Sequence, residues 1–404
     1  MKIVSGGVCA AKGFQAAGIH CGIRANHSKR DLALIVSSVP ASAAAVYTTN
    51  LVKGAPLTVT KRHISDGVAQ AVICNSGNAN TCNANGIEIA EEMSALTAQA
   101  LGIRAQDVVV ASTGVIGQPL NIAPIAAGIA PLKAALSDDG SADACEAIMT
   151  TDVKKKEIAV EFTVGGKTCH LGGIAKGSGM IHPNMATMLV FLTTDAAIAP
   201  AMLTKALQGD IRKTFNMISV DGDTSTNDMV AILANGLAGN DEITAEGEDF
   251  SAFMQALNTV NVYLCRGIAA DGEGATKLLE CAVSGAKDEA AAKTVAKSVV
   301  CSNLTKAAMF GEDANWGRVL CAIGYSGADV DVDKVGVSFR SAAGSVEVCR
   351  DGAGVPFSEK VAAHELHESE IDFLVTLGDG DGAATAWGCD LSYEYVRING
   401  DYRT

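Results

Sequence analysis

The sequence is poor in aromatic residues, which make up 4% of its 404 positions, whereas hydrophobic residues make up 48%. Its cores must therefore be built from Ala, Val, Ile and Leu, and a chain of this length can hold two or three domains. Long uncharged apolar runs are lacking, so we expect no membrane-spanning segment. The first residues carry one lysine and a short apolar patch instead of a signal peptide, so we expect a cytoplasmic protein.

Paired cysteine motifs and clusters of basic residues are lacking too. The twelve Cys are scattered as singletons without a C-x-x-C pair. This argues against zinc-ribbon and thioredoxin chemistry and for buried, reduced thiols. The formal net charge is -14 and no Lys/Arg cluster offsets it, so phosphate repulsion makes nucleic acid a poor partner. An acidic protein can still bind anionic amino acids, but it needs local cations to do so.

Motifs for metals and phosphates are incomplete. His364 and His367 are spaced i, i+3, whereas zinc metalloproteases need H-E-x-x-H. Asp221, Asp223 and Ser225 resemble the start of a calcium loop, but the sixth position is Thr instead of Gly and no Glu closes the loop, which favours a structural turn. The phosphate-loop motif G-x-x-x-x-G-K-[ST] is absent. We therefore expect no metal and no nucleotide cofactor.

The apolar patterns predict a mixed α and β protein in which strands end in small polar loops. A domain boundary is expected near residue 285. The expected strands are residues 32–36, 69–74, 108–111, 188–193, 334–339 and 345–349, the last two as an antiparallel hairpin. The expected helices are residues 86–96, 121–135, 200–209, 226–234 and 288–299.

One threonine, Thr187, follows a Gly-rich stretch and Pro183 and begins an apolar run. In isolation such a Thr is usually only a strand former. If the bond between Ala186 and Thr187 breaks, however, the new α-amine has a pKa near ~7.7–8.0 and can take the hydroxyl proton. The break can be self-driven, because the hydroxyl can attack the Ala186 carbonyl to form an ester that water releases. Glycines permit the strained backbone that this attack requires.

Three other positions suggest binding or catalysis. Thr113 follows a buried strand, where free backbone N–H groups can stabilise an oxyanion, although a simple strand-ending turn is the alternative. Lys176 is a lone cation in an apolar, Gly-rich setting, although most lysines are solvated surface charges. Glu273 lies in a Gly-flanked loop as either a solvated acid or a carboxylate that pairs with a cationic group of a ligand.

The segment 176–192 closely resembles the self-cleavage signature of the arginine-biosynthesis glutamate N-acetyltransferases, also called ornithine acetyltransferases. Further motifs resemble that family in the same order, so the resemblance covers essentially the whole chain. They are residues 6–8, 13–14, 31–35, 75–80, 112–117, 150–152, 219–228, 271–277 and 397–404.

This resemblance implies a four-layer αββα sandwich of the self-processing N-terminal-nucleophile type over residues 1–285, with a smaller α+β domain over residues 286–404. It implies that Thr187 is the nucleophile that carries acetyl from N2-acetyl-L-ornithine to L-glutamate. The implied oxyanion hole consists of the Thr113 hydroxyl and the Gly114 backbone N–H. The implied substrate-binding residues are Thr150, Lys176, Thr187, Glu273, Asn399 and Thr404.

The same resemblance implies that the fragments 1–186 and 187–404 stay associated and form an α2β2 heterotetramer. No metal or redox cofactor is expected, and the motifs leave open whether acetyl-CoA also donates acetyl. The alternative within enzymes is an N-terminal-nucleophile aminopeptidase or amidase of the same fold, whose acyl-enzyme passes to water. The alternative outside enzymes is an inactive structural relative.

Overall fold

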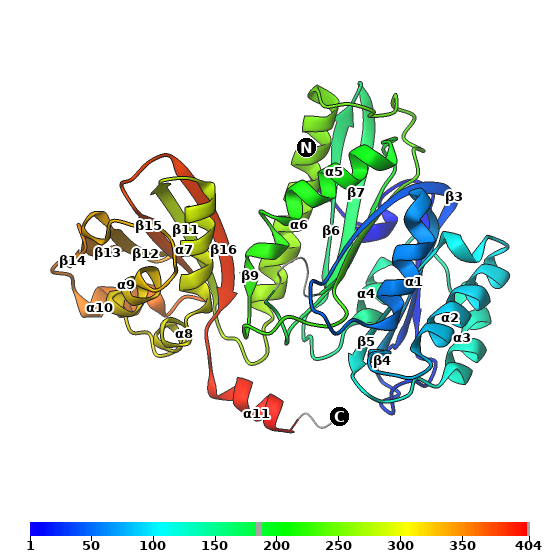
Figure 1. Ribbon diagram of the computed structural model, residues 1–404, viewed down its shortest axis with the longest axis horizontal. Coiled ribbons are helices and arrows are strands. Elements are labelled where there is room, and N and C mark those ends of the chain that lie inside the picture. The colour runs from blue at the N-terminus through cyan, green and yellow to red at the C-terminus, as the bar shows by residue number, and fades with distance from the viewer. Residues whose placement is uncertain (183–187, 402–404) are drawn as a thin grey trace.

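The computed structural model describes residues 1–182 and 188–401 and contains two β-sheets flanked by helices (Figure 1). The larger sheet has nine strands in the order β1-β6-β7-β8-β10-β3-β4-β5, with β2 added beside β3. Its strands are β1 (Lys2–Val4), β2 (Phe14–Ile19), β3 (Leu32–Tyr47), β4 (Val68–Asn78), β5 (Val108–Val115), β6 (Lys156–Val164), β7 (Lys167–Lys176), β8 (Leu189–Thr194) and β10 (Met229–Ala234).

Strand β3 belongs to both halves of this sheet. Residues 32–37 pair with β2, residues 32–36 and 41–42 with β4, and residues 42–47 with β10. The register with β4 shifts between Val36 and Ala41, an irregularity of the kind that bends a strand. The sheet therefore folds back on itself, and its two halves face each other as two layers.

The alternation of side chains along the strands defines the layers. In β5, Val109 lies in the inner core between the two sheet layers and Val110 lies in the outer core with α2 (Gly86–Leu101) and α3 (Ile122–Ala134). In β8, Phe191 lies in the same inner core and Leu192 packs in the cluster that contains α5 (Pro200–Ile211) and α6 (Glu248–Ala270). The expected α+β fold with a four-layer αββα sandwich is therefore confirmed.

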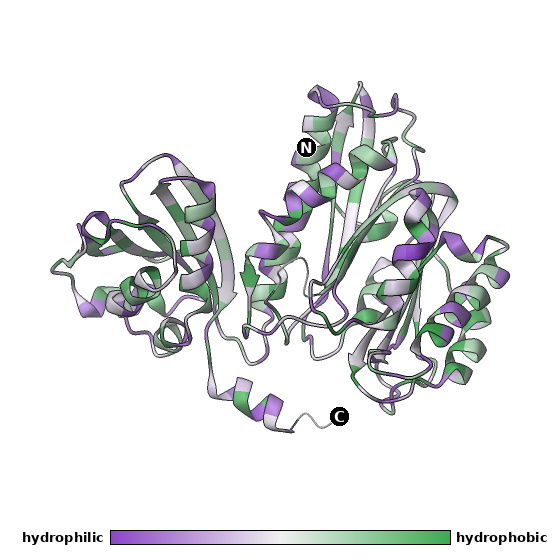
Figure 2. Cartoon of the chain, in the orientation of Figure 1, coloured by the Kyte–Doolittle hydropathy of each residue, from purple (hydrophilic) through white to green (hydrophobic). Residues whose placement is uncertain are grey.

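Because these strands are buried on both faces, they read in the sequence as continuous apolar runs. Figure 2 shows hydrophobic residues along the strands, whereas the helices carry both hydrophobic and hydrophilic residues. Helix α4 (Ser141–Ile148) contributes Ala144 and Cys145 to the inner core, and α1 (Ala55–His63) contributes Val59 to the core under α2.

One expected element is wrong. The run 226–234 was predicted to be a helix, but residues 229–234 form strand β10, which pairs in parallel with β8 and antiparallel with β3. All six of its side chains are buried. A short apolar run cannot be assigned by periodicity alone, and here pairing on both sides decides its conformation. The expected strands that became β3, β4, β5 and β8 are confirmed, as are the helices that became α2, α3, α5 and α7 (Glu289–Cys301).

The smaller sheet has seven strands in the order β14-β13-β12-β15-β11-β16-β9. It begins along the chain with β9, two residues that follow the larger sheet's β8 and pair with β16. The predicted hairpin is confirmed as β12 and β13. The strands are β9 (Ile218–Ser219), β11 (Leu278–Ala286), β12 (Gly336–Ser341), β13 (Gly344–Arg350), β14 (Ala353–Gly354), β15 (Glu370–Thr376) and β16 (Gly382–Cys389), with helices α7, α8 (Asn303–Phe310), α9 (Trp316–Gly324) and α10 (Glu359–Leu366).

The two units share one apolar cluster, in which α6 packs against β6 and β7 and also against β11 and β16. The chain leaves α6 and enters β11 at Leu278, a few residues before the expected division at 285. Helix α11 (Tyr393–Asp401) then runs back below both units (Figure 1). Within residues 1–182 and 188–401, no helix combines the length and apolar character that a membrane crossing requires.

Candidate active site

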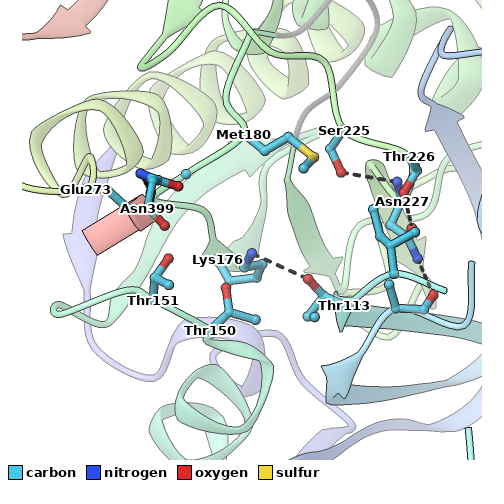
Figure 3. A pocket seen from close by; sticks show the side chains of 14 residues that line it. Thr113, Thr150, Thr151, Lys176, Met180, Ser225, Thr226, Asn227, Glu273 and Asn399 are labelled. Carbon is cyan, nitrogen blue, oxygen red and sulfur yellow. Dashed lines mark hydrogen bonds between the residues drawn. The ribbon is translucent and has the colours of Figure 1, made fainter. Parts of the chain in front are cut away.

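A cavity of about 160 Å³ lies at the ends of β5 and β7, on the side of the sandwich to which α11 returns (Figure 3). This volume is below the range of about 300–1,000 Å³ of drug-sized ligand pockets and suits a small metabolite. The described residues that line it are Ala79, Thr113, Gly114, Ile116, Thr150, Thr151, Lys176, Gly179, Met180, Ser225, Thr226, Asn227, Glu273 and Asn399.

Six residues expected from the sequence meet in this cavity, although five separate chain segments carry them. They are Thr113, Gly114, Thr150, Lys176, Glu273 and Asn399. Ala186, Thr187 and Thr404 lie outside the described residues. Met188, the residue after Thr187, is buried and lines a second, smaller cavity that adjoins the first. The roles of all these residues in catalysis and binding stay predictions.

Thr113 and Gly114 occupy the end of β5, beside the parallel strand β4. Gly114 has a φ of +133°, and a Cβ atom there would lie 2.4 Å from the Gly77 carbonyl carbon, so only glycine fits. The Thr113 Oγ1 accepts a long hydrogen bond of 3.4 Å from the Lys176 Nζ. Because the hydroxyl is an acceptor toward the lysine, its own proton is available to a ligand in the cavity.

Lys176 ends β7 and is 8% exposed. Burial lowers the pKa of its ammonium group, while the charge of Asp152 opposes this shift. The Asp152 carboxylate already accepts hydrogen bonds from the Lys156 Nζ at 2.7 Å and from the Gly177 backbone N–H at 2.6 Å. Among residues 1–182 and 188–401, the Lys176 cation therefore has only an indirect counter-charge, and an anionic ligand in the cavity would supply a direct one.

A buried ion-pair network supports the wall beside Lys176. The Lys156 Nζ lies 2.7 Å from the Asp152 Oδ1 and 2.6 Å from the Asp271 Oδ2. Burial alone would raise the pKa of Asp152, but Lys156 and Lys176 together hold it well below its usual value. Asp271 begins the loop that carries Glu273, so the network fixes both Gly177 and that loop.

Glu273 and Asn399 form the opposite wall (Figure 3). The Asn399 Nδ2 donates a 2.8 Å hydrogen bond to the Glu273 Oε2, which connects α11 to the cavity. The Glu273 carboxylate packs so closely on Gly179 that a Cβ there would lie 2.4 Å from its carboxyl carbon. The Glu273 backbone N–H donates to the Ser178 carbonyl at 3.1 Å, which holds the two loops together.

Asn227 is a site residue that the sequence analysis did not identify. Its Nδ2 donates to the Ala79 and Ser112 carbonyls at 2.6 and 2.9 Å, and its Oδ1 accepts from Thr81 and Thr226 at 2.6 and 2.7 Å. The bond to Ser112 fixes the backbone next to Thr113. The signal that could have found it is the polar run before β10, which resembles the Ser-Thr pair at the end of β5.

Asp221, in the segment 221–225 that was expected to be a structural turn, is hydrogen-bonded within the protein. The Asp221 carboxylate accepts hydrogen bonds from the backbone N–H groups of Met180 and Ile181 at 2.6 and 2.8 Å. The Asp221 carboxylate therefore holds the chain that follows Lys176 in place, and both of its oxygens accept hydrogen bonds from the protein.

Comparisons with known proteins agree on one family. The chain matches the family model described as the ArgJ family over residues 15–404. It is 53% identical to the arginine biosynthesis bifunctional protein ArgJ of Symbiobacterium thermophilum and 51% identical to that of Caldanaerobacter subterraneus subsp. tengcongensis, with 100% of each chain covered in both cases.

A solved structure is also similar. It is the crystal structure of the arginine biosynthesis bifunctional protein argJ from Bacillus halodurans, with 45% identity and a TM-score of 0.50, and the match covers 53% of this chain and 98% of that one. Since the family model spans nearly the whole sequence and full-length relatives share about half of its residues, the chain belongs to the ArgJ family.

Proposed function

We propose that this protein is an arginine-biosynthesis acetyltransferase that moves the acetyl group of N2-acetyl-L-ornithine to L-glutamate and releases ornithine. The observation that carries this proposal is the cavity itself. A buried cation, Lys176, and a carboxylate, Glu273, line one small space with the hydroxyl of Thr113. Amino acids with a carboxylate and a cationic amine match such a pair of charges, and the hydroxyl faces the acyl group.

In this proposal Thr187 is the nucleophile, freed by self-cleavage of the bond between Ala186 and Thr187. Its new α-amine takes the hydroxyl proton, since an α-amine has a pKa near ~7.7–8.0. The Thr113 hydroxyl and the Gly114 N–H hold the oxyanion. Acetyl passes first to the Thr187 oxygen and then to glutamate in a ping-pong sequence that needs no metal or redox cofactor.

Substrate binding is assigned to residues of both cavity walls. Lys176 and Thr150 bind the α-carboxylate, while Glu273 pairs with the cationic side chain of ornithine and is oriented by Asn399. We also assign Thr404 to substrate binding, because it matches the hydroxyl residue at the end of the family pattern.

The proposal includes two fragments, 1–186 and 187–404, that stay together. Strands β8 and β10 of the second fragment lie between β7 and β3 of the first, which supports this association. The match to the solved Bacillus halodurans chain includes 98% of that chain but only 53% of this one. This supports a division of the protein into two pieces of similar size. An α2β2 heterotetramer is the assembly that we propose for them.

A cytoplasmic location is part of the same proposal. The twelve Cys form no disulfide, and seven of them are buried, which supports a reducing compartment.

An assay of purified protein tests the activity. N-acetylornithine and glutamate together should yield N-acetylglutamate and ornithine, and intact mass should show both fragments. Thr187→Ala should remain one chain and transfer nothing, because no other residue supplies hydroxyl and amine together. Full activity in Thr187→Ala would refute the proposed nucleophile.

The same assay separates the alternatives. Acetate released from N-acetylornithine without glutamate, and no acetylated glutamate with it, would indicate the amidase alternative. Replacing N-acetylornithine with acetyl-CoA tests whether the protein can also use acetyl-CoA as the acetyl donor. A hydrolase needs water at the acyl-enzyme, whereas transfer needs water excluded from it.

A further inference from the structure

A second cavity of about 20 Å³ adjoins the main one and shares Thr113, Lys176, Ser225 and Asn227 with it. Its other described lining includes Met188 and Asp228. A space of this size admits about one water molecule, for which ~10–15 Å³ suffices. The small cavity is therefore a polar extension of the active site toward the first described residue of the second fragment.

Asp228 lines this cavity, lies immediately before β10 and is 2% exposed. The Met229 backbone N–H donates to the Met188 carbonyl at 2.8 Å, so Asp228 lies opposite the start of β8. Its Oδ2 is fully buried and has no hydrogen-bond partner in the described part of the chain. Burying a carboxyl oxygen without a hydrogen-bond partner is costly, and the proposed function assigns Asp228 no role.

The surroundings of Asp228 favour its neutral form. Burial raises its pKa well above the usual value, while hydrogen bonding to Ser225 and the charge of Lys176 oppose the shift. Lys176 is the only other titratable side chain among the described residues of the small cavity. The carboxyl group thus favours its protonated form and lies in the same small cavity as a buried cation.

We propose that Asp228 is a further catalytic residue, the acid that gives a proton to the departing nitrogen of the acetyl donor and recovers one from the incoming amine. This inference rests on the proposed acetyl transfer and adds a second proton-carrying group to it. The α-amine of Thr187 serves the hydroxyl oxygen, and Asp228 serves the substrate nitrogen.

The protons balance over the two half-reactions. In the first, the N–acetyl bond breaks and the acetyl–oxygen bond forms, the hydroxyl proton passes to the α-amine, and the Asp228 proton passes to the departing nitrogen. In the second, the ammonium of glutamate loses one proton to the Asp228 carboxylate and one to solvent as its nitrogen bonds to the acetyl carbon. The ester bond breaks, the α-ammonium returns its proton to the oxygen, and ornithine takes one proton from solvent.

The test is Asp228→Asn, which keeps the size and the neutral charge but cannot exchange the proton. We expect kcat to fall about 10²–10⁴-fold, with one ionisation lost from its pH profile and KM little changed. The matched control is Asp210→Asn. Asp210 is also buried with its pKa raised by burial, but it is bonded to Asn258 and Asn261 and lines neither cavity. Its variant should keep the wild-type kcat and profile.

Wild-type kcat and pH profile in a folded Asp228→Asn protein would overturn the proposal. If that variant folds but stays uncleaved while Asp210→Asn cleaves, the proposal is supported, because the amide nitrogen of Thr187 also needs a proton when it leaves. If wild type itself transfers no acetyl, the proposed function fails, which is a separate outcome.

A second measurement covers an Asp228→Asn variant that does not fold. In Asp210→Asn, infrared spectra should show a protonated carboxyl band that disappears with N-acetylornithine alone and returns with glutamate. A band that stays unchanged through both additions would overturn the proposal.

Discussion

Two buried lysines on neighbouring strands differ in how their charges are balanced. Lys156, on β6, is 3% exposed, and its Nζ contacts two carboxylates and the Lys154 carbonyl. Lys176, on β7, is 8% exposed, and its one direct side-chain contact among the described residues is the Thr113 hydroxyl at 3.4 Å. Burial lowers the pKa of both, but Asp152 and Asp271 reverse this shift for Lys156 alone.

This difference separates a charge that stabilises the fold from a charge that is kept for a ligand. A buried ion pair with complete hydrogen bonding contributes to a defined structure, and breaking it leaves an uncompensated charge. A buried cation with an incomplete set of partners reduces stability until an anion arrives. The same residue type thus has opposite consequences within one hairpin, and three variants can test the contrast.

The largest effect is expected for Lys156→Met. It leaves Asp152 and Asp271 buried without their shared cation, so we expect a loss of about 3–5 kcal/mol in the free energy of unfolding, measured in urea. Lys155→Met is the control, because Lys155 is 43% exposed in its side chain and pairs with Glu146 at 3.5 Å. We expect its stability to change by less than about 1 kcal/mol. Equal stabilities of the two variants would contradict a structural role for Lys156.

The next effect is expected for Thr113→Ala, which removes the direct partner of Lys176. If Thr113 holds the oxyanion, kcat should fall about 10²–10³-fold while KM changes little, because the hydroxyl acts mainly in the transition state. Thr113→Ser should keep much of the rate, since the hydroxyl survives. A raised KM with unchanged kcat would show that Thr113 binds substrate in the ground state instead.

The smallest effect is expected for Lys176→Met. Losing a charge-assisted hydrogen bond to a substrate carboxylate should lower kcat/KM. The expected loss of transition-state stabilisation is about 1.5–3 kcal/mol, seen mainly as a higher KM. Urea unfolding should show a stability equal to or above that of wild type, since a poorly paired buried charge is removed. A variant with wild-type kcat/KM, or one as unstable as Lys156→Met, would break the comparison between the two lysines.

The sequence predicted the strands with long apolar runs well, because burial on both faces leaves a clear pattern. It failed at residues 229–234, where strand pairing with β3 and β8 decides the conformation. The six site residues named from the sequence do meet in one cavity, and the family signature carried that prediction.

The contrast between the lysines could not be predicted. Lys156 belongs to the run Lys154-Lys155-Lys156, which looks like a solvated patch, and its partner Asp271 lies far along the chain at the end of α6. Asp228 stood in a polar run whose other members form turns and hydrogen bonds. Asp228 is buried because β10, which follows it, lies between β8 and β3, and the sequence alone does not show this position.

The position of β10 also governs when the enzyme can become active during its synthesis. Strand β3 leaves the ribosome early, but its neighbour β10 ends at residue 234, so the sandwich cannot close until well over half of the chain is made. Thr113 is made early, whereas Asn227, which fixes the neighbouring Ser112, comes more than 100 residues later, just before β10. If Thr187 cuts the chain as proposed, a nascent chain that ends before β10 still lacks the assembled site, so folding precedes the cut.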